Sequence, residues 1–557
     1  NLNEYVTSFD FYAAFAQAGN QYAFHFQPLE QIHLHSSLPY ELEPNGNITY
    51  VHIFGIIGLI ILLLACINFV NLATARAIKR SREVGIRKAL GSGRGQLIRQ
   101  FLLEAAVYVL IAASFAVLMA EFVLPYFNQL SDKQLAIQYL HNSKPLLLLG
   151  AIVVVMILGS GIYPALFLAS FKPVRVLKSR FTSDKKASWL RNGLIVLQFC
   201  LSTGLIIGTI TVQKQLKFIQ TKNLGIQTES ILIVESIQSL GDRHSAFRQQ
   251  LEQQSQIISA SVNRDVPFEH IDSQGFELEA PANMTQSSFN YLMVDEYFVE
   301  TVGLNVVKGR DFDLSFGTDS TAYLINQAAV AAIGWEQPIG KLITSGVGEG
   351  PVIGVVEDFH YQSLHLDIEP LIMPYNVWKP LYVLVRFAPG NVYEGVEIVK
   401  SVWQDFQPNY PIQYAFFDQE YQAQYESEQQ LAGLITSFSG LAIFLACLGL
   451  FGLTAYAAER RTKEIGIRKV MGSSELNILL LLIRDFLQMV LLSSLLAIPV
   501  TWFVIHHWLQ NFAYHINPGA GLFLIAIGIT AGVALIVVSA QSLTAALANP
   551  VDTLRNE

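Results

Sequence analysis

Long apolar runs dominate the chain. A helix that crosses about 30 Å of hydrocarbon needs roughly 20 mostly apolar residues. Seven runs are long enough, at residues 50–75, 97–125, 146–170, 191–212, 431–457, 476–509 and 519–547. The pattern therefore predicts an α-helical polytopic membrane protein with seven visible spans, and an odd number of spans places the two chain ends on opposite faces.

Between the fourth and fifth spans the pattern changes to that of a folded α/β domain. Apolar runs bounded by Gly and Pro predict strands at Ile231–Glu235, Val352–Val356, Leu381–Phe387 and Ile412–Phe417. Between the last two strands, apolar residues recur at helical spacing from Val392 to Phe406, which gives a β-α-β order. We expect one α/β domain in this connection.

The charges fix the predicted orientation. Segments 76–99, 172–191 and 460–484 carry eight, seven and six Lys/Arg, whereas residues 213–430 carry 12 Lys/Arg and 28 Asp/Glu. By the positive-inside rule, the basic segments and the C-terminus are cytoplasmic, and the acidic connection is periplasmic or extracellular. We therefore predict a multi-pass protein of the inner or plasma membrane.

Composition and motifs exclude several classes of function. Only 14% of the residues are charged and the net charge is −8, which disfavours a nucleic-acid binder. Cys66, Cys200 and Cys447 all lie in apolar runs, so they form neither a disulfide framework nor a metal knuckle. The sequence contains no Gly-x-Ser-x-Gly, His-Glu-x-x-His or Gly-x-x-x-x-Gly-Lys-[Ser/Thr] motif. We expect no catalytic residue, no metal ligand and no directly bound cofactor.

The chain contains an internal repeat. Residues 80–92 align without a gap with residues 461–473, at an offset of 381. The two segments share the first Arg, the Glu, the sequence Gly-Ile-Arg-Lys and the final Gly-Ser. Glu104 aligns with Asp485 at the same offset. The repeat predicts two related membrane units in parallel topology, each with an inward helix, a basic segment and two further helices.

The repeat also predicts the domain boundaries. Residues 1–49 form the end of a first periplasmic domain and 50–177 the first membrane unit. Residues 178–212 form a linker and the fourth visible span, 213–430 the outer domain, and 431–557 the second membrane unit. By the same logic, a further helix and outer domain are expected upstream of Asn1, in a parent of eight spans.

The repeated basic segment has the features of a short helix. Glu83 precedes Arg87 by four residues, the order that favours an ion pair on a helix, and Gly91 follows where a helix would end. Such a helix would present basic groups with Val84, Ala89 and Leu90. It either orients the protein against anionic lipid or docks on a shaped partner. The repetition of Gly-Ile-Arg-Lys in two diverged halves favours docking, and a pair of sites favours a two-fold partner.

Few polar residues lie inside the spans. Asn68, Asn71 and Gln198 are interpreted as helix-packing groups, because interhelical hydrogen bonds commonly join membrane helices. Glu104 and Asp485 fall near the inner boundary, where ion pairs with the basic segments are expected. No acidic chain marks an ion pathway, which disfavours a secondary transporter.

The repeated basic segment and three segments of the outer domain resemble those of a known family. Glu-[Val/Ile]-Gly-Ile-Arg-Lys-x-[Leu/Met]-Gly after an inward helix resembles the FtsX/MacB-type permeases of ATP-binding cassette (ABC) systems. Three outer segments resemble the MacB-like periplasmic core domain: Gly309-Arg310-Asp311-Phe312, Gln337-Pro338-Ile339-Gly340-Lys341 and Val355-Val356-Glu357-Asp358-Phe359. The resemblance covers essentially the whole chain and implies a duplicated FtsX-like permease domain.

The resemblance implies a site and its partners. The segments that contact nucleotide-binding subunits would be those at 80–95 and 460–475, with coupling residues Glu83, Gly85, Ile86, Arg87, Lys88, Gly91, Glu464, Gly466, Ile467, Arg468, Lys469 and Gly472. ATP would be bound by a separate cytoplasmic ABC ATPase subunit, in two copies. Membrane lipid surrounds the spans, and a periplasmic adaptor or a substrate protein or peptide is a further expected partner.

Two functions are left open by the sequence. The first is a permease that couples ATP hydrolysis to export or extraction of a substrate on the periplasmic side, as a mechanotransmission device. The second is an FtsX-like signalling protein that controls a periplasmic partner enzyme. An enzyme embedded in the membrane would need a nucleophile or metal cluster, and the sequence offers none.

Overall fold

A computed structural model describes residues 27–36, 46, 48–131, 134–136, 143–170, 185–269, 271–279, 287–375, 379–460, 467–468, 471 and 473–547. The chain divides into two compact units. Unit 1 comprises Asn1–Asn47, Lys217–Ser427 and Gln510–His515, and unit 2 comprises Ile48–Leu216, Glu428–Leu509 and Ile516–Glu557.

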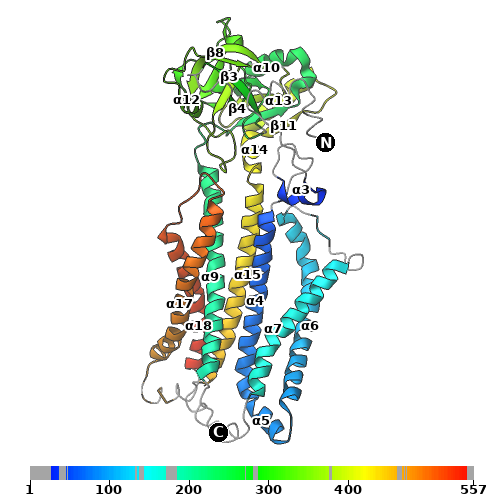
Figure 1. Cartoon of the computed structure of the whole chain (residues 1–557), viewed down its shortest axis with the longest axis vertical. Helices are drawn as coiled ribbons and strands as arrows, with labels where there is room; N and C mark the ends of the chain where they lie inside the picture. The colour runs from blue at the N-terminus through cyan, green and yellow to red at the C-terminus, as the bar shows by residue number, and fades with distance from the viewer. Residues whose placement is uncertain are drawn as a thin grey trace, which may run out of the picture. The chain divides into compact units, whose positions relative to one another are not determined.

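Unit 2 is helical (Figure 1). Its helices are α4 (Ile48–Lys79), α5 (Ser81–Ala89), α6 (Arg94–Ser131), α7 (Ser143–Ala169), α9 (Lys185–Thr221), α15 (Glu426–Arg460), α17 (Glu475–Leu509) and α18 (Ala520–Leu547). All except the short α5 are long and apolar enough to cross a membrane, which makes seven such helices in the described part of the chain. The seven predicted spans are confirmed.

The helices of unit 2 pack as two related sets. Helix α6 packs against α7, and α17 packs against α18 (Figure 1). Buried apolar side chains join α5 to α6 and α7 at Val84, Leu97 and Leu168. A larger buried cluster joins α9, α15, α17 and α18.

Polar groups connect the helices at one close approach. The Asn68 side chain on α4 donates from Nδ2 to the Leu445 carbonyl oxygen of α15 at 2.6 Å, and Gln198 on α9 donates to the same oxygen at 3.5 Å. Gly449 lies beside both amides, because a Cβ there would stand 2.0 Å from Asn68 Oδ1. The interpretation of Asn68 and Gln198 as helix-packing groups is confirmed. Asn71 is also buried, but its amide makes no hydrogen bond with the residues that the structure describes.

Unit 1 contains two β-sheets. The first has the order β11-β1-β10-β2. Its strands are β1 (Ile231–Glu235), β2 (Ile257–Asn263), β10 (Tyr382–Phe387) and β11 (Gln413–Phe416). Helices η1 (Ile237–Arg243), α10 (His244–Glu252) and α13 (Val392–Phe406) accompany it. Val399, Trp403 and Phe247 bury their side chains against Leu232 and Val385 in one apolar core.

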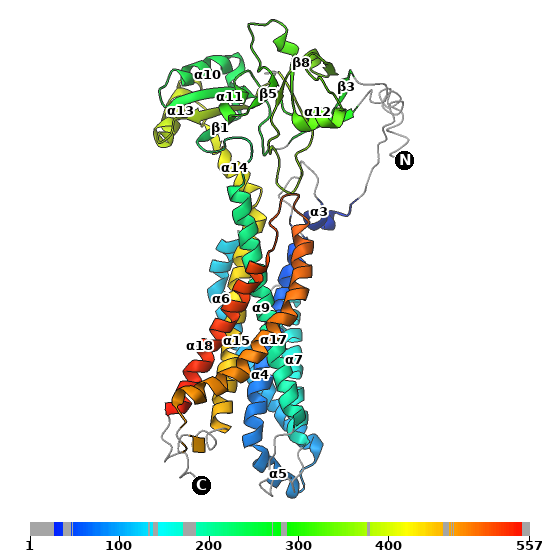
Figure 2. The same ribbon diagram turned by 90° about the vertical axis from the view of Figure 1, so that its left-hand side faces the viewer.

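The second sheet has the order β5-β8-β6-β9-β4-β3-β7, and β7 also pairs with β8. Its strands are β3 (Ser273–Leu278), β4 (Ser287–Tyr291), β5 (Val306–Gly309), β6 (Tyr323–Asn326), β7 (Leu342–Ser345), β8 (Gly348–Val356) and β9 (Leu371–Pro374). Helices α11 (Phe298–Val302), η2 (Asp319–Thr321), α12 (Gln327–Ile333) and α14 (Phe417–Ala423) complete the domain, and α3 (Leu29–His35) is also described. Figure 2 shows the two sheets as neighbouring lobes of unit 1.

The strand predictions are confirmed, with one topological difference. The β-α-β segment forms as β10-α13-β11, but β10 and β11 are not neighbours. Strand β1 lies between them and is antiparallel to both, with Ile233 opposite Leu384 and Ala415. The periodicity of 381–417 could not show this, because β1 comes from a segment about 150 residues earlier in the chain.

Candidate functional site

Helix α5 in the first basic segment is held by polar contacts. Arg87 Nη2 lies 2.8 Å from Glu83 Oε1, which confirms the predicted ion pair, and Arg87 Nη1 donates to Gln100 Oε1 at 2.8 Å. Lys88 donates from Nζ to the Ala169 carbonyl oxygen at 2.6 Å. Arg87 and Lys88 of α5 therefore bind neighbouring parts of their own chain.

The start of α5 is fixed as well. Arg80 precedes the helix and donates to both carboxylate oxygens of Glu104, at 2.7 and 2.9 Å. The expected ion pair of Glu104 with the basic segment is confirmed. Arg94 donates to the same Ala169 carbonyl oxygen as Lys88, at 3.2 Å. Burial and the nearby Arg94 charge lower the pKa of Lys88.

The end of α5 is repeated in the second half of the chain. Gly91 has φ of +101°, a conformation that Gly adopts without steric cost, and it follows the helix end directly. The Leu90 and Ser92 amides donate to the Ile86 and Arg87 carbonyl oxygens, both at 3.0 Å. At the offset of 381, the Met471 and Ser473 amides donate to the Ile467 and Arg468 carbonyl oxygens, at 3.0 and 2.9 Å. The repeat thus preserves backbone geometry as well as sequence.

Two apolar side chains at the end of α5, Ile86 within it and Leu90 directly after it, are exposed. Ile86 is 45% exposed and Leu90 83%. Their counterparts Ile467 and Met471 are 53% and 81% exposed. Val84 is buried, at 2% exposure, so the expectation that it faces a partner is wrong. The helix turns Val84 toward Leu97 and Leu168, because this position lies on the face that packs against α6 and α7.

Several predicted site residues of the second basic segment are not among the residues that the structure describes. Glu464, Gly466, Lys469 and Gly472 lie outside the described residues. Gly85 is described and buried, next to the exposed Ile86. Sequence reasoning named Ile86 and Ile467 but not Met471, although the apolar Leu90–Met471 pair in the repeat is the signal that could have identified it.

The outer-domain motifs hold the fold. Gly309 has φ of +76°, and a Cβ there would stand 2.2 Å from the Ile353 carbonyl oxygen, so only Gly fits. Arg310 forms a two-point ion pair with Asp319, whose side chain is fully buried, and hydrogen bonding from Arg310 lowers the pKa of Asp319. Asp358 caps the first turn of α12 by accepting from the Ala328 amide at 2.8 Å. The contacts of Gly309, Arg310 and Asp358 therefore stabilise the fold of the α/β domain.

The loop between α17 and α18 belongs to unit 1 and pairs with the segment after β8. The Ala513 amide donates to the His365 carbonyl oxygen at 3.3 Å, and the Tyr514 amide donates to the Leu364 carbonyl oxygen at 3.2 Å. The Leu364 amide donates to Tyr425 Oη at 2.7 Å. We call this pairing of 510–515 with the α/β domain the outer contact. Nothing in the linear pattern indicated it.

Aromatic rings complete the outer contact. The Phe512 and His365 rings stack with centroids 4.2 Å apart, and the His360 and Tyr514 rings meet edge-on at 4.6 Å. The Lys222 ammonium lies 4.6 Å from the centre of the Tyr514 ring. Burial, with a smaller contribution from the Lys222 charge, lowers the pKa of His360 to about 4.

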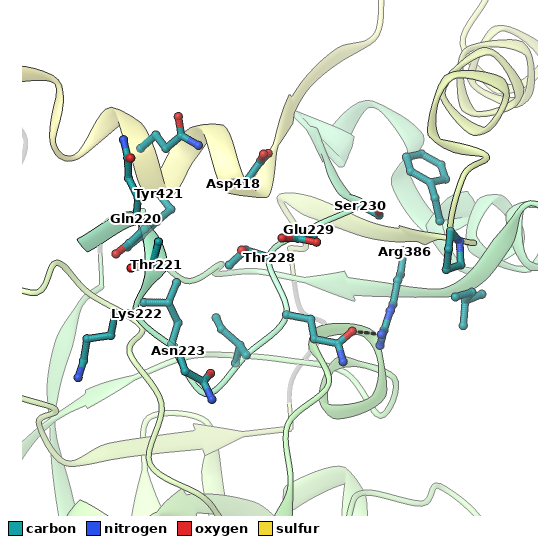
Figure 3. Close-up of a pocket in the computed structure, with 17 residues that line it drawn as sticks. Gln220, Thr221, Lys222, Asn223, Thr228, Glu229, Ser230, Arg386, Asp418 and Tyr421 are labelled. Atoms are coloured by element: carbon teal, nitrogen blue, oxygen red, sulfur yellow. Dashed lines mark hydrogen bonds between the residues drawn. The ribbon is translucent and has the colours of Figure 1, made fainter. Parts of the chain in front are cut away.

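A cavity of about 720 Å³ lies in unit 1 beside the end of α9 and α14 (Figure 3). Its lining includes four charged side chains, Lys222, Glu229, Arg386 and Asp418, together with Tyr421. Within the described residues, no group of three or more His, Cys, Asp or Glu could hold a metal ion. The three cysteines are free.

Comparison with known proteins places the repeat in a family. The family model of the FtsX-like permease C-terminal domain matches twice, at residues 55–173 and 436–550. Each match includes one of the two basic segments described above. The duplication predicted from the offset of 381 is therefore supported independently.

Curated relatives are ABC permeases. The macrolide export ATP-binding/permease protein MacB of Bartonella quintana is 23% identical over 217 residues, covering 37% of this chain and 32% of that protein. The uncharacterized ABC transporter permease YknZ of Bacillus subtilis is 43% identical over 68 residues, covering 12% and 17%. MacB of Campylobacter jejuni is 31% identical over 128 residues, covering 22% and 18%. The matched part of the chain thus spans 32% or less of the length of these relatives.

Two solved structures are similar to part of the chain. The periplasmic region of MacB from Actinobacillus actinomycetemcomitans aligns with a TM-score of 0.27 and 17% identity, over 37% of this chain and 96% of that chain. The extracellular domain of the ABC-type transporter YknZ from Gram-positive bacteria aligns with a TM-score of 0.24 and 12% identity, over 36% and 94%.

Proposed function

Because this chain is an FtsX/MacB-type permease of the ABC systems, we propose that it couples ATP hydrolysis by a separate cytoplasmic ATPase to export or extraction of a substrate at the outer side of the membrane. The chain itself carries no catalytic group in this scheme, and ATP is bound by the partner. The basic segments and the C-terminus face the cytoplasm, and the α/β domain faces the periplasm or the exterior.

The observation that carries the proposal is the repeated apolar face of the basic segments. Ile86 and Leu90, and at the same offset Ile467 and Met471, are exposed in segments too rich in Lys and Arg to lie within lipid. An apolar pair four residues apart on a short helix is suited to docking in a groove on another protein. Two copies of the face fit two ATPase subunits.

The basic residues then have a supporting role. Glu83, Arg87 and Lys88 hold α5 on α6 and α7 through the contacts described above, so the helix moves with its neighbours. Gly91, with its positive φ, ends the helix and directs Leu90 outward. By the repeat, we expect Glu464, Gly466, Arg468, Lys469 and Gly472 to belong to the second coupling segment.

Transmission to the outer side would use α9 and α15. Within unit 2, Thr209 and Ser439 share a hydrogen bond at 2.7 Å, and Gln213 Nε2 donates to Thr436 Oγ1 at 3.1 Å. Such interhelical hydrogen bonds keep α9 and α15 in register, so that a displacement at the cytoplasmic end of the two helices is transmitted along both. The outer contact offers a second route, through α17 and α18.

The test is co-purification of the ATPase with the full-length protein from its native membrane. The variant Ile86→Ser, Leu90→Ser, Ile467→Ser, Met471→Ser should weaken ATPase binding by about a hundredfold or more, since each of the four side chains that docking buries contributes up to roughly 1.5–3 kcal/mol. The matched control is Leu314→Ser with Ile339→Ser, two residues of the α/β domain that are 47% and 44% exposed.

Two outcomes would contradict the proposal. Undiminished ATPase binding by the fourfold variant would remove the docking role of these segments. Capture of a periplasmic enzyme without any ATPase would favour the signalling alternative, in which the chain controls that enzyme. Protease added to sealed spheroplasts should cut within 213–430 and spare 80–95, and cutting in the basic segments would overturn the orientation.

A further inference from the structure

The cavity of about 720 Å³ lies where two segments that continue into membrane helices enter the α/β domain. Gln220 and Thr221, at the end of α9, form part of its wall, and Asp418 and Tyr421 of α14 form another part. Tyr421 donates from its hydroxyl to the Ile219 carbonyl oxygen at 2.9 Å, which joins α14 to α9 beside the cavity. All of these residues belong to unit 1.

Four charged side chains line the cavity without an opposite charge as partner. Lys222, Glu229, Arg386 and Asp418 take part in no salt bridge within the described part of the chain. Arg386 donates only to neutral acceptors, the Gln227 side-chain oxygen and the Glu300 carbonyl oxygen, the latter at 3.2 Å. Lys222 also lies over the Phe218 and Tyr514 rings, so the cavity offers a ligand two carboxylates and the Arg386 guanidinium.

The charges are separated across the cavity. Figure 3 shows Lys222 at one side and Arg386 at the other, with Thr228 and Glu229 between them and Asp418 near Glu229. A ligand with a single sign of charge would meet both favourable and unfavourable groups. A ligand with an ammonium and a carboxylate can place the ammonium beside Glu229 and Asp418 and the carboxylate beside Arg386.

The backbone that carries these side chains is fixed in advance. The Gln227 amide donates to the Val302 carbonyl oxygen at 2.8 Å, and the Phe387 amide donates to the Ser230 carbonyl oxygen at 2.9 Å. Ser230 has φ of +60°, an uncommon conformation for a non-Gly residue. A preformed wall lowers the entropy that a ligand must lose on binding.

From this arrangement we propose that the cavity is a binding site for a zwitterion of short-peptide size, with its ammonium group at Glu229 and Asp418 and its carboxylate group at Arg386. The volume lies within the roughly 300–1,000 Å³ of small-molecule sites. Phe387, Pro389 and Ile258 add apolar surface for a side chain of the ligand.

The cavity lies beside α9 and α14, so ligand binding there can affect both segments. A ligand in the cavity contacts the end of α9 and α14 at once, so it stabilises one arrangement of the two segments. Under the proposed function, on which this consequence rests, occupancy changes the rate of ATP hydrolysis by the partner. Ligand binding itself requires no ATPase, so an experiment can refute the binding site without refuting the proposed function, and the reverse.

The experiment is titration calorimetry on the full-length protein in detergent, with the tripeptide Ala-Phe-Ala as the probe. Two derivatives each lack one charge: the N-acetyl tripeptide and the tripeptide amide. The unmodified tripeptide should bind about tenfold to a hundredfold more tightly than either derivative, because each removes a charge-assisted interaction. ATPase activity of the complex is measured in parallel.

The variant Glu229→Gln with Asp418→Asn tests the assignment of the ends. It should weaken binding of the unmodified tripeptide by about tenfold or more and leave binding of the N-acetyl derivative unchanged. The control Asp405→Asn alters an exposed carboxylate outside the cavity and should bind like the wild type. The site is refuted if the three peptides bind equally or if the double variant binds the unmodified tripeptide as tightly as the wild type. Peptide binding without any change in ATPase activity would retain the site and refute only its coupling.

Discussion

Lys88 Nζ lies 2.6 Å from the main-chain carbonyl oxygen of Ala169, the last residue of α7. The two residues are 81 positions apart in the chain. The contact satisfies a carbonyl group that the helix end leaves without an intrahelical partner. It also fastens α5 to α7, so a force applied to the exposed Ile86 and Leu90 reaches a membrane helix directly.

This contact separates docking from transmission. We predict that Lys88→Met leaves ATPase binding within about twofold of wild type, because the apolar face remains, but lowers substrate-dependent ATPase activity. The lost hydrogen bond is worth about 1 kcal/mol at this partly exposed position. The control is Arg99→Met, an exposed residue of α6. If Lys88→Met weakened ATPase binding as much as it lowered ATPase activity, the ammonium itself would contact the partner.

Two glycines of α15 provide a matched test of helix packing. A Cβ at Gly449 would stand 2.0 Å from Asn68 Oδ1 and 2.9 Å from Gln198 Nε2, whereas a Cβ at Gly440 would have no neighbour within 4 Å. Gly449→Ala should destabilise the helical unit by about 1–3 kcal/mol through overpacking. Gly440→Ala should be neutral or stabilising by up to about 1 kcal/mol, because Ala favours the helix. Thermal unfolding of the detergent-solubilised protein measures both, and equal midpoints would contradict the close approach.

The ion pair of Arg310 with Asp319 predicts a pH-dependent stability. Hydrogen bonding from Arg310 lowers the pKa of Asp319 below its ordinary 3.8, so the stabilisation is complete above that pH and is lost as the pH falls through the lowered pKa. Asp319→Asn should destabilise the α/β domain at pH 7 by about 2–3 kcal/mol, less than for a fully buried pair because Arg310 is partly exposed. The difference from wild type should narrow in strong acid. Asp367→Asn, an exposed residue, is the control, and a difference independent of pH would rule out the ion pair as its source.

The outer contact should weaken in acid. The pKa of His360 falls from 6.5 in the unfolded chain to about 4 in the folded protein, so the neutral ring stabilises the contact fully above pH 6.5. Its contribution decreases as the pH falls from 6.5 to 4, because protonation charges a buried ring and also places a second cation beside Lys222. Hydrogen exchange of the Ala513 and Tyr514 amides should accelerate over this range, relative to amides of β1. His360→Gln should remove the pH dependence, and its persistence in that variant would assign it to another group.

The linear sequence was sufficient for the membrane architecture and the duplication. Span length is a local property, since about 20 apolar residues must follow one another in the chain. The ion pair of Glu83 with Arg87 and the helix end at Gly91 were also predictable, because both depend on residues within one or two helical turns. Strand β1 and helix α13 followed from the same kind of short-range pattern.

Tertiary structure decided which surfaces are available. Val84 and Ile86 both belong to the repeated segment, but only the position of α6 and α7 buries the first and exposes the second. The stack of Phe512 on His365 and the placement of β1 between β10 and β11 join residues more than 140 positions apart. No local period encodes such contacts, since they form only when distant segments share one core. The cavity arises in the same way, because its four charged side chains come from three separate stretches of chain that meet only in the folded domain.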